Sequence, residues 1–73
     1  MSKYGHLWMY IDLIFKRTNK EKIKLSFNQI KDATGFEIDH SFLTYKKELL
    51  DYGYKVEKIK LKDKIIIFSK YRY

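Results

Sequence analysis

The stretch that decides the fold is residues 26–36, Ser-Phe-Asn-Gln-Ile-Lys-Asp-Ala-Thr-Gly-Phe. Ser26 and Gln29 have the spacing of a capping box, in which each side chain bonds the backbone amide of the other residue. A short helix should follow, from Phe27 to about Thr34. Gly35 predicts its end, because glycine enters the left-handed region without strain. The inner side of this helix should carry Phe27, Ile30 and Ala33.

The segments before this stretch predict a helix and a strand. From about Gly5 to Thr18, Leu7, Ile11 and Ile14 follow the three-and-four spacing of an amphipathic helix. Asn19 is suited to close this helix. Apolar and polar residues then alternate over 22–27, which is typical of a short half-buried strand.

After Gly35 the pattern predicts another helix, capped by Asp39 and running to about Tyr52. Gly53 should end it. The expected inner face carries Phe42, Leu43, Tyr45, Leu49 and Leu50. The expected outer face carries His40, Ser41, Thr44, Lys47, Glu48 and Asp51.

The last part of the chain predicts a hairpin around the polar tip Lys62-Asp63-Lys64. A three-residue loop would place Leu61 opposite Ile65, and Ile59 opposite Ile67, on one inward face. Lys58 and Lys60 would then point to the other face, together with Ile66 and Phe68. The spacing from Val56 to Ile59 breaks the alternation and predicts a bulge.

The order helix, strand, helix, turn, helix, strand, strand resembles a winged helix-turn-helix domain over nearly the whole chain. Ile30 to Gly35, followed by Phe36, is similar to the core of that motif. The resemblance implies a single small α+β domain over residues 1–73. It also implies that the helix from Asp39 to Tyr52 enters the DNA major groove and that the hairpin from Lys55 to Lys70 forms the wing.

The chain also resembles a family of short bacterial proteins of unknown function. The resembling pieces are Lys3-Tyr4-Gly5 with Leu7, Ile23 to Phe27 with Ile30, Gly35-Phe36, and Tyr52-Gly53-Tyr54-Lys55-Val56. Many members carry a tryptophan-rich stretch where this chain has Tyr45-Lys46-Lys47-Glu48. That family implies no activity, so its likeness bears on the fold.

Composition and charge limit the classes of function. With 73 residues and no cysteine, the chain has no disulfide, no thiolate zinc site and no cysteine nucleophile. The net charge is +7 and is concentrated in two segments. Residues 16–24 carry five cations against one acid, and residues 55–73 carry seven against two. This distribution is typical of nucleic-acid binders, although many residue types here have AT-rich codons, so base composition alone could supply lysines.

Catalysis, cofactors and metals have no support in the sequence. His6 and His40 show no motif spacing to a carboxylate, and there is no glycine-rich phosphate loop. The longest apolar stretch is far too short to span a bilayer. We therefore expect a cytoplasmic protein that is not an enzyme and holds no cofactor or metal.

The leading hypothesis is a small DNA-binding protein, such as a transcriptional regulator, acting on duplex DNA. A chain of this size usually reads a useful length of DNA as a dimer, which favours a homodimer. Alternate lysines on the hairpin can lie against phosphates, or they can simply guard an exposed strand edge. The alternative function is a protein-interaction module, such as a small inhibitor or adaptor encoded by a phage or mobile element. The residues expected to bind nucleic acid are His40, Ser41, Thr44, Lys47, Lys58, Lys60, Lys62, Lys64, Lys20 and Lys22.

Overall fold

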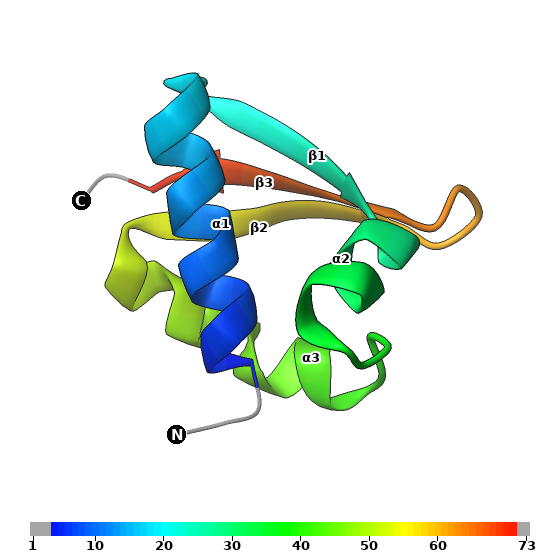
Figure 1. Ribbon diagram of the computed structural model, residues 1–73. Helices are drawn as coiled ribbons and strands as arrows, with labels where there is room; N and C mark the ends of the chain where they lie inside the picture. The colour runs from blue at the N-terminus through cyan, green and yellow to red at the C-terminus, as the bar shows by residue number, and fades with distance from the viewer. Residues whose placement is uncertain (1–3, 72–73) are drawn as a thin grey trace.

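The computed structural model describes residues 4–71, and Lys3 of the second resemblance lies outside them. Three helical segments cover one side of a three-stranded antiparallel sheet with strand order β1-β3-β2 (Figure 1). The molecule is thus a small α+β domain, as the sequence predicts. Its elements are α1 (Gly5–Thr18), β1 (Lys22–Ser26), α2 (Phe27–Thr34), α3 (Ser41–Tyr45), the 3-10 helix η1 (Lys46–Tyr52), β2 (Tyr54–Lys60) and β3 (Ile65–Lys70).

The local signals in the first half of the chain are confirmed. Ser26 and Gln29 form both hydrogen bonds of the capping box at the start of α2. Asn19 and Gly35 end α1 and α2 in the left-handed conformation, with φ of 53° and 83°. Ile30 is fully buried, whereas Ala33 is exposed, so the inner side of α2 is narrower than predicted.

The helix predicted from Asp39 to Tyr52 is not one α-helix. Only α3 is α-helical, and it continues as the 3-10 helix η1. With about three residues per turn, residues three apart lie above one another. Tyr45 and Glu48 therefore share a side, and they contact Tyr4 and Trp8 at the start of α1. Leu43 and Tyr45 were expected inside but are 54% and 40% exposed.

The predicted hairpin exists, but its predicted register is wrong. Ile59 pairs with Ile66, not with Ile67, because the connecting turn spans residues 61–64 instead of three residues. The register shift between Val56 and Lys58 confirms the predicted bulge. As a result Ile66 and Phe68 are fully buried, and Ile65 and Ile67 lie on the opposite face.

One hydrophobic core joins the helices to the inner face of the sheet. Trp8 of α1 lies in it and is almost fully buried. Its indole Nε1 donates a hydrogen bond to Glu48 Oε1 at 2.9 Å. Glu48 is therefore held against α1 and is not part of an open outer face, contrary to the sequence prediction.

Candidate nucleic-acid interface

The face of the sheet that points away from the helices carries most of the predicted lysines. Paired residues of neighbouring strands project to the same side, and Ile66 and Phe68 of the central strand point into the core. Ile65, Ile67 and Ser69 alternate with them along β3 and therefore point to the opposite side. The residues of β1 and β2 that pair with these three point to that side as well. We call this side the outer sheet face: Lys22, Lys24, Ser26, Lys55, Glu57, Lys58, Lys60, Ile65, Ile67 and Ser69.

The end of the outer sheet face away from the β2–β3 turn is partly neutralised, because one carboxylate lies close to two lysines. We call it the closed end. Glu57 lies 3.9 Å from the Lys22 ammonium and 3.7 Å from that of Lys55. Ser69 donates a hydrogen bond to Glu57 Oε2 at 2.7 Å. This hydrogen bond and the two lysines lower the pKa of Glu57 below its usual value, so the carboxylate stays charged and offsets part of the positive charge of its neighbours.

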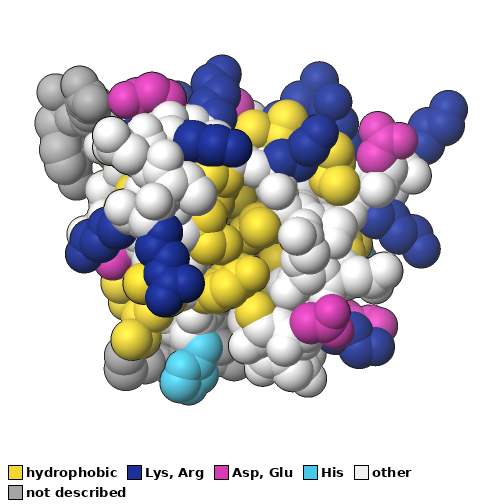
Figure 2. All heavy atoms as spheres, turned by 45° about the horizontal axis from the view of Figure 1, so that its top comes forward, with side chains coloured by type: hydrophobic (Ala, Val, Ile, Leu, Met, Phe, Trp, Pro, Cys, Tyr) yellow, Lys and Arg dark blue, Asp and Glu magenta, His cyan; other side chains and the backbone are white. Residues whose placement is uncertain are grey.

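The other end of the outer sheet face has an excess of positive charge. We call it the open end: Lys24, Lys58 and Lys60, continued on the turn by Lys62 and Lys64. Lys24 and Lys58 both pair with Ile67, and Lys60 pairs with Ile65, so the cations flank an apolar central strand. The turn also carries Asp63, but within residues 4–71 none of the ion pairs involves this carboxylate or the five lysines. Figure 2 shows Lys and Arg side chains along the upper and right-hand margins of the molecule, over the sheet and the turn.

The closed end is also the place where the sheet is fastened to α1. Tyr54 begins β2, and its hydroxyl donates to Asp12 Oδ1 at 2.6 Å. Its ring stacks on Phe15 with centroids 4.4 Å apart. Burial, followed by the bond to Asp12, raises the pKa of Tyr54 to about 12, while that bond, together with Lys16, lowers the pKa of Asp12. This end of the sheet therefore has a structural role.

The site residues predicted on the helix from Asp39 to Tyr52 are not brought to the outer sheet face. Ile59 and the α3 residue Phe42 line one hollow, whereas Lys58 and Lys60 point to the opposite side of β2. His40 borders that hollow, and Ser41 is bonded to Asp39 and close to the Tyr4 hydroxyl. Thr44 and Lys47 are exposed. The ten residues predicted as one interface thus fall on two separate surfaces.

Three lysines before and on β1 need reassignment. Lys22 is paired with Glu57, so it is a member of the closed end. Lys20 is exposed just before β1, near the same end. Lys24 is absent from the predicted set but belongs to the open end. The alternation of residues 22–27 could have identified it, because Lys24 lies between the inward-facing Ile23 and Leu25.

The part of the chain that the structure describes shows neither a metal-binding cluster nor a membrane-spanning helix. Across residues 4–71, no three His, Asp or Glu side chains are gathered in a way that could hold a metal ion. None of the helices described is both long and apolar enough to cross a membrane. His6 and His40 are exposed and come from different elements.

The chain was compared with known proteins at three levels. No family model matches it, and no curated protein or solved structure does so either.

Proposed function

We propose that this protein binds duplex nucleic acid through the open end of its outer sheet face and the β2–β3 turn. We further propose that the domain is a winged helix-turn-helix variant. The element order and the sheet order β1-β3-β2 support this assignment. The hairpin of β2 and β3 corresponds to the wing, and the short α3 with its 3-10 continuation departs from a regular recognition helix.

The observation that carries the proposal is the contrast between the two ends of one sheet face. At the closed end a carboxylate lies close to both lysines. At the open end five lysines gather without an ion-pair partner within residues 4–71. Like charges held together on a rigid sheet repel one another, and a polyanion relieves that repulsion. Lysines can also protect an exposed strand edge from pairing with another chain. That role alone does not require the ion-paired lysines to lie at one end of the sheet and the lysines without ion pairs at the other.

The side chains of the open end favour contact with phosphates. None of the residues on the outer sheet face is aromatic, so the face offers no ring for stacking on unpaired bases. Adjacent strands lie roughly 4.8 Å apart, which puts the lysine rows of β1 and β2 about 10 Å from each other. Flexible lysine stems on both rows can reach the phosphates of a duplex. Such contacts position a protein without reading sequence, so binding should tolerate many sequences.

The experiment is a titration of mixed-sequence duplex at several salt concentrations. The variant Lys58→Ala/Lys60→Ala/Lys62→Ala should weaken binding at low salt and reduce the slope of log affinity against log salt by about 1 for each phosphate that is no longer neutralised. The matched control is Lys16→Ala/Arg17→Ala/Lys31→Ala, which removes the same three charges from α1 and α2. An equal loss in both variants, or no binding by the wild type at low salt, contradicts the proposal.

A further inference from the structure

The backbone of the β2–β3 turn contains one unusual residue. Lys64 has a φ of 55°, in the left-handed region that most L-residues avoid. The other residues with a positive φ within residues 4–71 are Asn19, Gly35 and Gly53. Glycine and asparagine enter this region readily, whereas lysine does so at a cost in stability. Lys64 is therefore the one left-handed residue of the described chain whose type does not suit its backbone.

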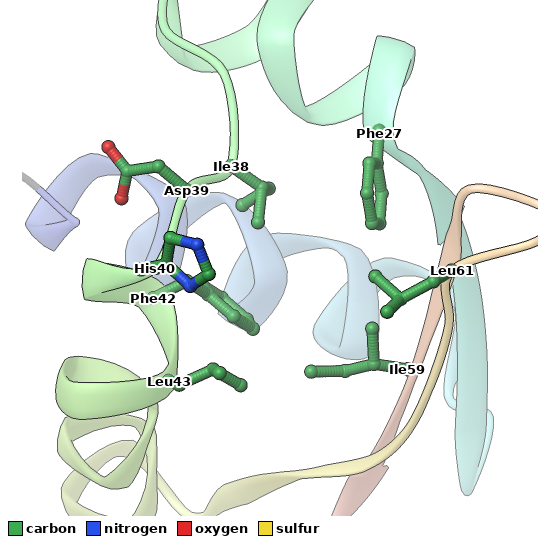
Figure 3. Close-up of a pocket in the computed structure, with 8 residues that line it drawn as sticks. All are labelled: Phe27, Ile38, Asp39, His40, Phe42, Leu43, Ile59 and Leu61. Atoms are coloured by element: carbon green, nitrogen blue, oxygen red, sulfur yellow. The ribbon is translucent and has the colours of Figure 1, made fainter.

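Contacts on two sides hold this residue in place. The Lys64 carbonyl accepts a hydrogen bond from the amide of Phe27, the first residue of α2, at 2.9 Å. The Lys64 amide donates to the Leu61 carbonyl at 3.3 Å. Figure 3 shows Phe27 and Leu61 pointing into the same hollow, an apolar groove of about 390 Å³ between α2, α3 and the end of β2. A strained backbone persists where the surrounding structure fixes it in this way.

The contacts fix the backbone of Lys64 but do not explain its side chain. That side chain is exposed, and none of the ion pairs within residues 4–71 involves it. Glycine is the usual residue at the left-handed position of a hairpin turn. Base composition does not account for lysine here, because asparagine also has AT-rich codons and suits this backbone. Strained residues cluster at binding sites, where their role in binding outweighs the cost in stability.

We propose that Lys64 is the principal phosphate contact of the open end, and that the turn holds it there at the expense of folding stability. This inference rests on the proposed nucleic-acid binding and names the residue on which that binding depends most. The hydrogen bonds to Phe27 and Leu61 order the turn before binding, so a phosphate does not have to order it. Lys62 carries the same charge on the same turn, but its φ is not positive.

Thermal unfolding tests the cost in stability. Lys64→Gly and its matched control Lys62→Gly each remove one lysine from the turn. Lys64→Gly should raise the melting temperature by about 4 °C or more, because glycine relieves the left-handed strain. Lys62→Gly should leave the melting temperature unchanged or lower it, since glycine there only adds freedom to the unfolded chain. Lys64→Asn is a second variant that suits the backbone, and it should also be more stable than the wild type.

Titration of mixed-sequence duplex at several salt concentrations tests the role in binding. Lys64→Gly and Lys64→Asn should each weaken binding about tenfold at low salt and reduce the slope of log affinity against log salt by about 1. The loss for Lys62→Gly should be at least about threefold smaller. Lys64→Arg keeps the cation and should bind within about twofold of the wild type. Stability and binding therefore change in opposite directions at Lys64 and not at Lys62.

Several results would overturn the proposal for Lys64. Wild-type affinity in Lys64→Gly and Lys64→Asn, losses no larger than that of Lys62→Gly, or no gain in melting temperature in either variant would each do so. If Lys58→Ala/Lys60→Ala/Lys62→Ala weakens duplex binding and the Lys64 variants do not, the proposed function stands and only the role of Lys64 is wrong. If the wild type does not bind duplex at low salt, both proposals are wrong.

Discussion

The two ends of the outer sheet face share the same three strands and the same lysine-rich composition, yet they are built differently. At the closed end, Glu57 pairs with Lys22 and Lys55 and offsets part of their charge, and Tyr54 bonds the sheet to α1. At the open end, Lys24, Lys58 and Lys60 project beside the turn without a carboxylate at ion-pair distance in the described chain. The same residue type therefore serves cohesion at one end and is available for binding at the other. Counting lysines does not separate the two roles, but locating the acids does.

Reversing charge at the open end should have the largest effect. Lys24→Glu/Lys60→Glu places one acid on each edge strand and should weaken duplex binding by about 100-fold or more at low salt, because attraction to phosphate becomes repulsion. The unfolding free energy should change little, since Lys24 is exposed and Lys60 is half-buried on the outer face. Fluorescence anisotropy with labelled duplex measures the affinity. If the variant binds duplex within twofold of the wild type, the open end has no special role in duplex binding.

Breaking the attachment at the closed end should affect stability and leave duplex binding intact. Tyr54→Phe keeps the ring stacked on Phe15 but removes the hydrogen bond to Asp12, at a cost of about 1–2 kcal/mol in unfolding free energy. Chemical denaturation measures the change. A parallel loss of duplex affinity, with the variant still folded, would show that the closed end takes part in binding.

The same tyrosine predicts a pH dependence with a definite sign. Its pKa is raised to about 12 in the folded protein, so the unfolded chain releases this proton first as pH rises above the usual value near 10. The stabilisation from Tyr54 is present below pH 10 and is lost between about pH 10 and 12. The difference in unfolding free energy between wild type and Tyr54→Phe should shrink over that range. A constant difference would contradict the buried, bonded state of the hydroxyl.

Freeing the closed-end lysines should make the two ends more alike. Glu57→Gln removes the negative charge beside Lys22 and Lys55 but keeps a hydrogen-bond acceptor for Ser69. Duplex binding should tighten by about threefold to tenfold, and the salt slope should rise by up to about 2 if both lysines gain phosphates. An unchanged slope would place the closed end beyond the reach of the nucleic acid. Glu37→Gln is the matched control, because it frees Lys31 far from the sheet.

Changes on α3 and η1 should have the smallest effect on duplex binding. Thr44→Ala/Lys47→Ala alters two exposed residues of the helical segment that lies on the groove side of β2. We expect the affinity to stay within about twofold of the wild type. Sequence preference should not change, since contacts between the sheet and phosphates do not distinguish one base sequence from another. A clear loss, or relaxed preference between two duplexes, would instead support major-groove reading by α3.

Local sequence signals predicted most of the fold. The bounds of α1 and α2, the capping box and the left-handed Asn19 and Gly35 follow from residues a few positions apart. The hairpin register did not follow, because the turn is one residue longer than predicted, and a shift of one residue exchanges the two faces of β3. The change from α3 to the 3-10 helix η1 also escaped prediction. Glu48 in η1 is bonded by Trp8, forty positions away, and such a long-range contact leaves no local signal in the sequence.

The position of the candidate site on the hairpin was predictable from the sequence, whereas the full set of residues that form it was not. Alternation placed Lys58 and Lys60 on one side of the hairpin, and this is confirmed. The pairing of Lys22 with Glu57 was not predictable, because it requires β1 and β2 to flank β3. The apolar groove was not predictable either, because the apolar pattern that includes Leu43 and Leu61 is also typical of an ordinary buried face. Burial of a given leucine depends on whether another element covers it.

The most direct test of the central claim compares two single variants on one strand. Lys58→Ala removes a lysine from the open end, and Lys55→Ala removes one from the closed end, with the same change in net charge. Salt titrations against one duplex should give a slope reduced by about 1 for Lys58→Ala and an unchanged slope for Lys55→Ala. Equal slopes for the two variants would contradict the assignment of nucleic-acid binding to the open end.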